Sequence, residues 1–138
     1  MGTRESPIPI GTTFELNNGW EITVVDVIPY ADDMIKEENM FNQEPDSGSQ
    51  YFLAMIAAKN NGTSVDKIKG YYFNVVGPSA VAYEKASVVT PDPLPDTDIF
   101  PGGTAEGYVC WEVKSSDAGN LTMYHQHVEP YVFFSLKP

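Results

Sequence analysis

The chain contains 138 residues, a length typical of one folding domain. Hydrophobic residues make up 42% of the sequence and charged residues 20%, a composition that indicates a globular protein and excludes an intrinsically disordered one. Nineteen acidic and eight basic residues give a formal net charge of −11. Because a field of this sign repels phosphate groups, we expect no nucleic acid partner. The acidity is explained by solubility, with a cation or a basic partner as the alternative.

The first ten residues have the composition of a linker. No apolar run in the chain approaches the roughly 18 residues needed to span a bilayer, and residues 1–10 lack the apolar centre of a signal peptide. Met1, Gly2 and Thr3 followed by a proline-containing stretch indicate a cloning remnant ahead of a linker. We therefore expect residues 1–10 to be linker or remnant, residues 11–138 to form the domain, and a targeting segment to have been lost.

The first strands are predicted around an Asn-Gly turn. Phe14 and Leu16 alternate with polar residues and lead into Asn18 and Gly19, a pair that suits a tight hairpin. A strand follows over residues 20–28. Its alternation breaks after position 24, which indicates a bend or burial of both faces.

Residues 31–50 form an acidic insertion that differs from the flanking strands. The segment carries six acidic residues and several loop formers, and connections of this length are either functional or mobile. Its large apolar residues are Met34, Ile35, Met40 and Phe41. These side chains either dock on the edge of the domain or form a sticky surface for a partner. We favour docking, because exposed apolar area costs about 25 cal/mol per Å².

The remaining strands are spaced at short intervals. Residues 51–58 are almost continuously apolar, which predicts a central strand covered on both faces. Strands are expected at residues 71–76 and 81–83, followed by a proline-rich extended crossover over residues 91–101. Residues 104–114 alternate most clearly and turn Trp111 toward the core.

Two further strands are expected near the C-terminus, at residues 121–125 and 131–136, which gives about seven or eight strands. The pattern predicts an all-β, immunoglobulin-like β-sandwich of two antiparallel sheets with one long acidic insertion. The residues expected in its core are Trp20, Leu53, Met55, Val109, Trp111 and Phe133.

The order of these motifs resembles a known family. The motifs are Trp20-Glu21-Ile22-Thr23-Val24, Tyr51-Phe52-Leu53-Ala54-Met55, Lys59-Asn60-Asn61-Gly62, Pro101-Gly102-Gly103 and Gly107-Tyr108-Val109-Cys110-Trp111-Glu112-Val113. Over residues 11–136 the chain is similar to the uncharacterised immunoglobulin-like domain of bacterial surface lipoproteins, a relative of the mycobacterial secreted immunoprotective antigen. The resemblance implies a sandwich exported to the outer face of the membrane, held there by a linker, without catalytic residues. The acidic insertion departs from the family pattern.

Three residues near the end of the chain form a candidate metal site. Met123, His125 and His127 are spaced two apart, so they share one face of a continuous strand. Thioether and imidazole groups together are a ligand set for copper. The alternative is that both histidines are exposed near the end of a strand.

A second candidate cation site lies in the proline-rich segment. Asp92, Asp96 and Asp98 supply carboxylate oxygens at a spacing that could meet around calcium. The alternative is a solvated acidic loop.

A catalytic function would require Cys110 to meet one of the two histidines as a nucleophile and base pair. A lone strand cysteine is more often a small apolar filler, so we expect no enzyme and no cofactor. The eight tyrosines favour β-strands, with a carbohydrate-binding or protein-binding face as the alternative.

The leading functional hypothesis is a non-catalytic, extracellular or cell-surface interaction or spacer module of an exported lipoprotein. Its partner is an unknown protein or cell-envelope component, it meets the membrane only through a lipid anchor outside this chain, and it is a monomer or weak dimer. The second hypothesis is an extracytoplasmic copper-binding or calcium-binding domain.

Overall fold

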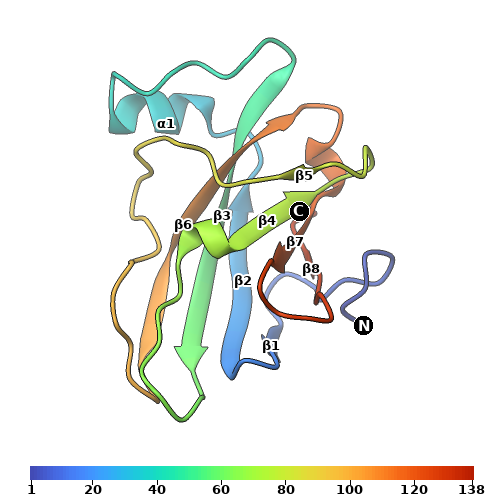
Figure 1. Cartoon of the computed structure of the whole chain (residues 1–138). Coiled ribbons are helices and arrows are strands. Elements are labelled where there is room, and N and C mark those ends of the chain that lie inside the picture. Colours follow the sequence, from blue (N-terminus) through green and yellow to red (C-terminus); the bar gives the residue numbers. More distant parts are fainter.

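Two four-stranded antiparallel sheets face each other in the computed structural model, which describes residues 1–138 (Figure 1). The first sheet has the order β1 (Thr13–Glu15), β2 (Trp20–Ile28), β3 (Ser49–Asn60) and β6 (Thr104–Lys114). The second has the order β5 (Ala82–Tyr83), β4 (Phe73–Val76), β7 (Thr122–His125) and β8 (Phe134–Ser135). The helices are α1 (Asp32–Glu38) and the 3₁₀ turns η1 (Gly70–Tyr72) and η2 (Ala118–Asn120). The predicted antiparallel β-sandwich is therefore confirmed.

The Asn-Gly hairpin joins β1 to β2 as predicted. Gly19 has φ of 90°, and the side-chain oxygen of Asn18 accepts a hydrogen bond from the Trp20 amide at 3.2 Å. The register of β2 against β3 then shifts between Val24 and Asp26. This bulge leaves Val25 on the surface and returns Val27 to the core, which accounts for the break in alternation.

The main core lies between the two sheets. Trp20, Val109 and Trp111 are buried there as predicted, and the Trp111 indole nitrogen donates to the Phe73 carbonyl of the facing sheet at 2.9 Å. The prediction for Phe133 was wrong, since this side chain is partly exposed on the outer face of the second sheet.

The neighbouring residue Phe134 fills the inner position. The register explains the difference, because Phe134 lies opposite Met123, which points inward. Sequence alternation alone could not choose between the two phenylalanines, since both faces of that strand carry large apolar groups.

β3 is covered on both faces over only part of its length. Phe52 and Ile56 face the second sheet, whereas Leu53 belongs to a smaller cluster beneath α1. Beyond the helix, Met55 and Ala57 are partly exposed on the outer face of the first sheet. The core prediction was therefore right for burial of Leu53 but placed it in the wrong cluster, and it was wrong for Met55.

The N-terminal residues pack on the second sheet, in contrast to the expected linker. Ile8 is fully buried in the main core and pairs with the edge of β8, where its amide donates to the Phe133 carbonyl at 2.8 Å. The Phe133 amide in turn donates to the Gly2 carbonyl at 2.8 Å. This stretch therefore extends and covers an edge that would otherwise be unpaired.

α1 has seven residues and lies across one end of the first sheet (Figure 1). Ile35 is its buried residue and packs in the smaller cluster with Leu53 and Cys110. No helix of the structure has the length and apolar character needed to cross a membrane.

The proline-rich segment runs along the free edge of β6. Pro93 pairs with Tyr108, and the Leu94 amide donates to the Tyr108 carbonyl at 3.1 Å. The backbone of Leu94 also passes close to Gly107. A β-carbon at that glycine would lie 2.3 Å from the Leu94 nitrogen. Only glycine therefore fits at position 107.

We predict that Gly107→Ala lowers the free energy of unfolding by about 2–3 kcal/mol, because the added methyl group forces the proline-rich backbone away from β6. The matched control is Gly119→Ala, where a β-carbon would meet nothing within 4 Å. Urea denaturation of both variants measures the difference, and equal stabilities would contradict the close packing of residues 94 and 107.

Candidate functional site

A large surface hollow lies between the acidic insertion and the chain after β5. We call it the insertion groove. Its volume is about 690 Å³, compared with about 230 Å³ for a hollow on the outer face of the first sheet. The groove is lined by Phe41, Asn42, Gln43, Tyr51, Ala82, Tyr83, Glu84, Ala86, Ser87, Val88 and Glu112.

The floor of the groove is set by the pairing of β3 with β6. Tyr51 lies directly opposite Glu112 in this register, two positions beyond the buried outer-face pair of Leu53 and Cys110. The hydroxyl of Tyr51 donates to the Gln43 carbonyl at 2.8 Å. A residue of the central strand therefore holds the insertion from below.

One side-chain amide connects the two walls of the groove. Asn42 is 7% exposed, and its nitrogen donates to the carbonyls of Ile35 at 2.8 Å and Val89 at 2.9 Å. Its oxygen accepts a hydrogen bond from the Val89 amide at 2.8 Å. The bond to Ile35 also satisfies a carbonyl in the last turn of α1. These bonds fix the loop after the helix against the segment after β5.

Two large apolar side chains stand in solvent beside this buried amide. Phe41 is 86% exposed and Met40 is 73% exposed, while the Phe41 amide is held by the Asn39 side chain at 2.9 Å. The expected docking of the insertion is thus correct for Ile35, which is fully buried, and wrong for Met34, Met40 and Phe41, which are exposed. The bonds of the Asn39 and Asn42 side chains fix the backbone on either side of Phe41, which lines the groove.

The opposite wall is braced by Asp117. This carboxylate is 2% exposed and accepts hydrogen bonds from the hydroxyls of Tyr83 and Ser79, both at 2.6 Å. Burial acts to raise the pKa of Asp117, but the hydrogen bonds from Ser79 and Tyr83 outweigh burial and hold it below its ordinary value. Asp117 therefore stays ionised and fixes the ring of Tyr83 in the wall.

The interior of the groove is electronegative. Glu84 and Glu112 line it and neither forms an ion pair, although Glu112 accepts a hydrogen bond from the Asp46 amide at 3.0 Å. Burial raises the pKa of the Tyr51 hydroxyl, and the Glu112 carboxylate raises it further. Lys36 pairs with Glu44 outside the groove lining at 3.7 Å.

The structure separates the three residues of the predicted copper site. Met123 is fully buried between the sheets, and His125 is 5% exposed at the edge of the same core. His127 lies beyond the end of β7 and is exposed. The two imidazole rings are 5.9 Å apart, and Nδ1 of His125 accepts a hydrogen bond from the His127 amide at 3.1 Å.

Two of the three predicted calcium ligands form ion pairs with lysines. Asp96 pairs with Lys69 at 3.8 Å and Asp98 with Lys67 at 3.9 Å. The Asp92 carbonyl accepts a hydrogen bond from the amide of a β6 residue. No group of three or more His, Cys, Asp or Glu side chains is placed to hold a metal ion.

Cys110 lies on the opposite side of the first sheet from the histidines. Its side chain is fully buried beneath α1, whereas His125 faces the space between the sheets. Burial raises the pKa of the Cys110 thiol to about 12, so the thiolate is not formed at neutral pH. Cys110 therefore does not meet either histidine as a nucleophile and base pair.

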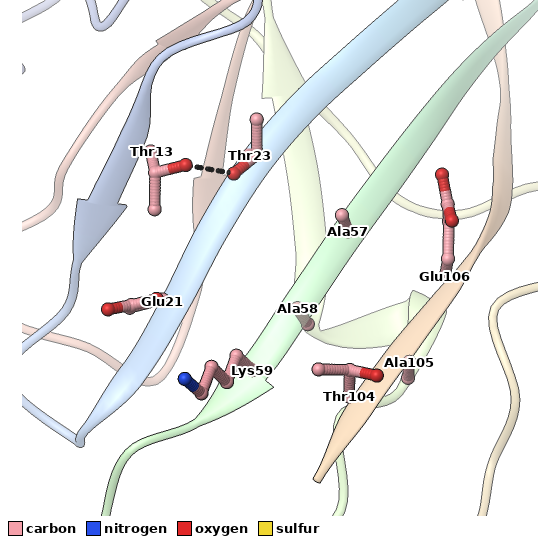
Figure 2. A pocket seen from close by; sticks show the side chains of 9 residues that line it. All are labelled: Thr13, Glu21, Thr23, Ala57, Ala58, Lys59, Thr104, Ala105 and Glu106. Carbon is pink, nitrogen blue, oxygen red and sulfur yellow. Dashed lines mark hydrogen bonds between the residues drawn. The ribbon is translucent and has the colours of Figure 1, made fainter. Parts of the chain in front are cut away.

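The hollow on the outer face of the first sheet is lined by side chains of β1, β2, β3 and β6 (Figure 2). It exists because Ala57 is a small residue between Thr23 and Glu106 on the neighbouring strands. Lys59 and Glu21 lie opposite each other in the register of β3 and β2 at one end of it. No large exposed apolar side chain lines it, in contrast to the insertion groove.

Sequence reasoning identified only one wall of the groove. The insertion was recognised through its apolar residues, including Phe41. The other wall, which includes Tyr83, Glu84 and Val88, carried no distinguishing signal in the sequence. It lies far from the insertion along the chain, as the bond from Asn42 to Val89, 47 residues apart, illustrates.

Comparisons with known proteins bear on the fold. No protein-family model matches the chain in sequence. No curated protein matches it either. Among solved structures, the secreted protein MPT63 of Mycobacterium tuberculosis is similar with a TM-score of 0.62 at 13% identity, covering 96% of this chain and 98% of that one.

Two Bacillus subtilis structures are also similar. One, described as "a putative lipoprotein (ycdA)", has a TM-score of 0.64 at 12% identity, covering 89% of this chain. This chain spans only 38% of the length of ycdA. The yjhA protein has a TM-score of 0.62 at 12% identity, covering 86% of this chain and 79% of that one. At these identities the likeness shows a shared β-sandwich fold.

We predict that the protein loses stability as the pH falls from about 6.5 to about 4. Burial, and then the charge of His127, lowers the pKa of His125 from 6.5 to about 4 in the folded state. The unfolded chain therefore binds more protons in this interval, so stability rises with pH across it. Urea unfolding at a series of pH values measures the slope.

The matched variants are His125→Phe, which should flatten this slope, and His127→Gln, which should retain most of it. A slope that is unchanged in His125→Phe would contradict the burial of a neutral imidazole at this position.

Proposed function

We propose that this chain is a non-catalytic interaction module of an exported, lipid-anchored protein and that the insertion groove is its binding surface. One observation carries the proposal: Phe41 is 86% exposed although the next residue, Asn42, is 7% exposed and bonded on both sides. The chain thus places a large aromatic side chain in water next to a buried, hydrogen-bonded amide.

The energetics favour an interaction role for this arrangement. Exposed apolar area costs about 25 cal/mol per Å², and the loop gains nothing in folding from a phenylalanine in solvent. Aromatic side chains are typical anchors of protein interfaces, where burial against a partner recovers this free energy. The fixed backbone also reduces the entropy lost on binding, because the rim is already ordered.

Two observations support a non-catalytic, extracytoplasmic role. Cys110, the single cysteine, is buried with a raised thiol pKa and lies away from both histidines. The structurally similar ycdA and MPT63 proteins are described as a lipoprotein candidate and a secreted protein, respectively.

A metal-binding function has less support. Met123 could reach a metal only inside the core, and removing it leaves two histidines, one of which already uses Nδ1 in a hydrogen bond. Copper sites of the type suggested by the sequence need a third ligand.

Phe41→Ala tests the groove directly. Because the side chain is largely exposed, we expect the free energy of unfolding to change by less than about 0.5 kcal/mol. Peptides selected from a phage-displayed random library on the unmodified chain should bind Phe41→Ala at least about tenfold more weakly, a loss typical of an interface anchor.

The matched control is Val25→Ala, which removes another exposed apolar side chain, 43% exposed, from the outer face of the first sheet. We expect the selected peptides to bind this variant normally. Peptides that bind Phe41→Ala as well as the unmodified chain would contradict the groove as the interaction surface.

The extracytoplasmic assignment has a separate test. We expect the native gene to encode an upstream signal sequence with a lipid-attachment cysteine. A native gene that lacks both would contradict this part of the proposal and leave the groove unaffected.

A further inference from the structure

The chemistry of the groove indicates the class of its partner. Two carboxylates, those of Glu84 and Glu112, line it without a basic side chain in ion-pair contact. Lys85, which follows Glu84, does not itself line the groove; its ammonium group donates to the Ala86 carbonyl at 3.3 Å, and its stem lies beside Gly70. Lys36 donates to the Asn42 carbonyl at 3.2 Å and pairs with Glu44, so Glu84 and Glu112 are left without an ion-pair partner.

Aromatic groups line the groove together with these carboxylates. Phe41 forms the exposed rim, while Tyr51 and Tyr83 line the groove with hydroxyls committed to internal hydrogen bonds. The committed hydroxyls leave the rings as contact surfaces. An aromatic ring beside carboxylates is the setting in which a guanidinium or ammonium group gains both ion pairing and cation–π attraction. Burial, then Glu112, raises the pKa of Tyr51, in agreement with negative potential at the floor.

We propose that the insertion groove binds a cationic segment of a partner protein, placing an arginine or lysine side chain between the carboxylates of Glu84 and Glu112 and against the ring of Phe41. This inference rests on the proposed function and adds the chemistry of the partner. The net charge of −11 acts in the same direction, because it attracts a basic partner over a distance and opposes self-association of two copies.

A short peptide of alternating arginine and serine, capped at both ends, is the probe. We expect saturable binding by isothermal titration calorimetry that weakens as salt is added. The matched peptide with citrulline in place of arginine keeps the shape and loses the charge. It should bind at least about tenfold more weakly, since charge-assisted hydrogen bonds are lost.

Paired variants locate the charge effect. The double variant Glu84→Gln, Glu112→Gln should lower the affinity for the arginine peptide at least about tenfold. The control Glu21→Gln, Glu106→Gln removes the same number of charges from the open outer face of the first sheet and should change affinity less than about twofold, because those charges are distant and screened. Circular dichroism and thermal unfolding establish that each variant is folded.

Several results would overturn the cationic partner. Equal losses of affinity in the two double variants would mean general attraction to an acidic protein. Equal affinity for the citrulline and arginine peptides would mean that the groove does not recognise the charge of the peptide. Displacement of the arginine peptide by calcium alone would assign the carboxylates to a metal, and concentration-dependent dimerisation through Phe41 would assign the groove to a second copy.

The outcome is separable from that of the proposed function. If library-selected peptides require Phe41 but carry no excess of arginine or lysine, the groove remains the interaction surface and the cationic partner is wrong. If the arginine peptide binds, and if it loses affinity for the Glu84→Gln, Glu112→Gln variant but not for the control variant, both the groove and its cationic partner are supported.

Discussion

The side-chain amide of Asn42 is the interaction on which the functional surface depends. It joins the end of α1 to the segment after β5, two parts of the chain with no other side-chain hydrogen bond of this kind between them. A buried amide is stable only when its donors and acceptor are paired, so the bonds to Ile35 and Val89 must form together. Without them the two walls of the groove would lose the side-chain hydrogen bonds that join them directly.

The sandwich contributes to the same surface through strand register. The long pairing of β3 with β6 places Leu53 opposite Cys110 beneath α1 and then Tyr51 opposite Glu112 at the groove floor. The same pair of strands thus supplies residues to the buried cluster and to the floor of the groove. The central strands hold the groove from below, and the loops determine its chemistry.

Sequence patterns were informative where one physical constraint dominated. The alternation of residues 104–114 and the Asn-Gly turn before Trp20 identified their strands, because burial of one face and a positive φ leave few alternatives. They failed for Phe133, where both faces of the strand are apolar, and for residues 1–10, where Ile8 completes a sheet edge through long-range pairing. Met123, His125 and His127 have the spacing of one strand face, but β7 ends at His125, so His127 lies outside the strand. The groove joins distant segments, so only its insertion side was visible.

Amide hydrogen exchange at Val89 is the most direct measurement of the central claim, that the insertion is held in place. The amide donates to the Asn42 side chain in a region without strand pairing, so its protection reports that bond. We expect slow exchange at Val89 in the unmodified chain and nearly unprotected exchange in Asn42→Ala, with the amides of β3 and β6 unchanged. Unprotected exchange at Val89 in the unmodified chain would mean that the insertion is a mobile arm, and would contradict the account.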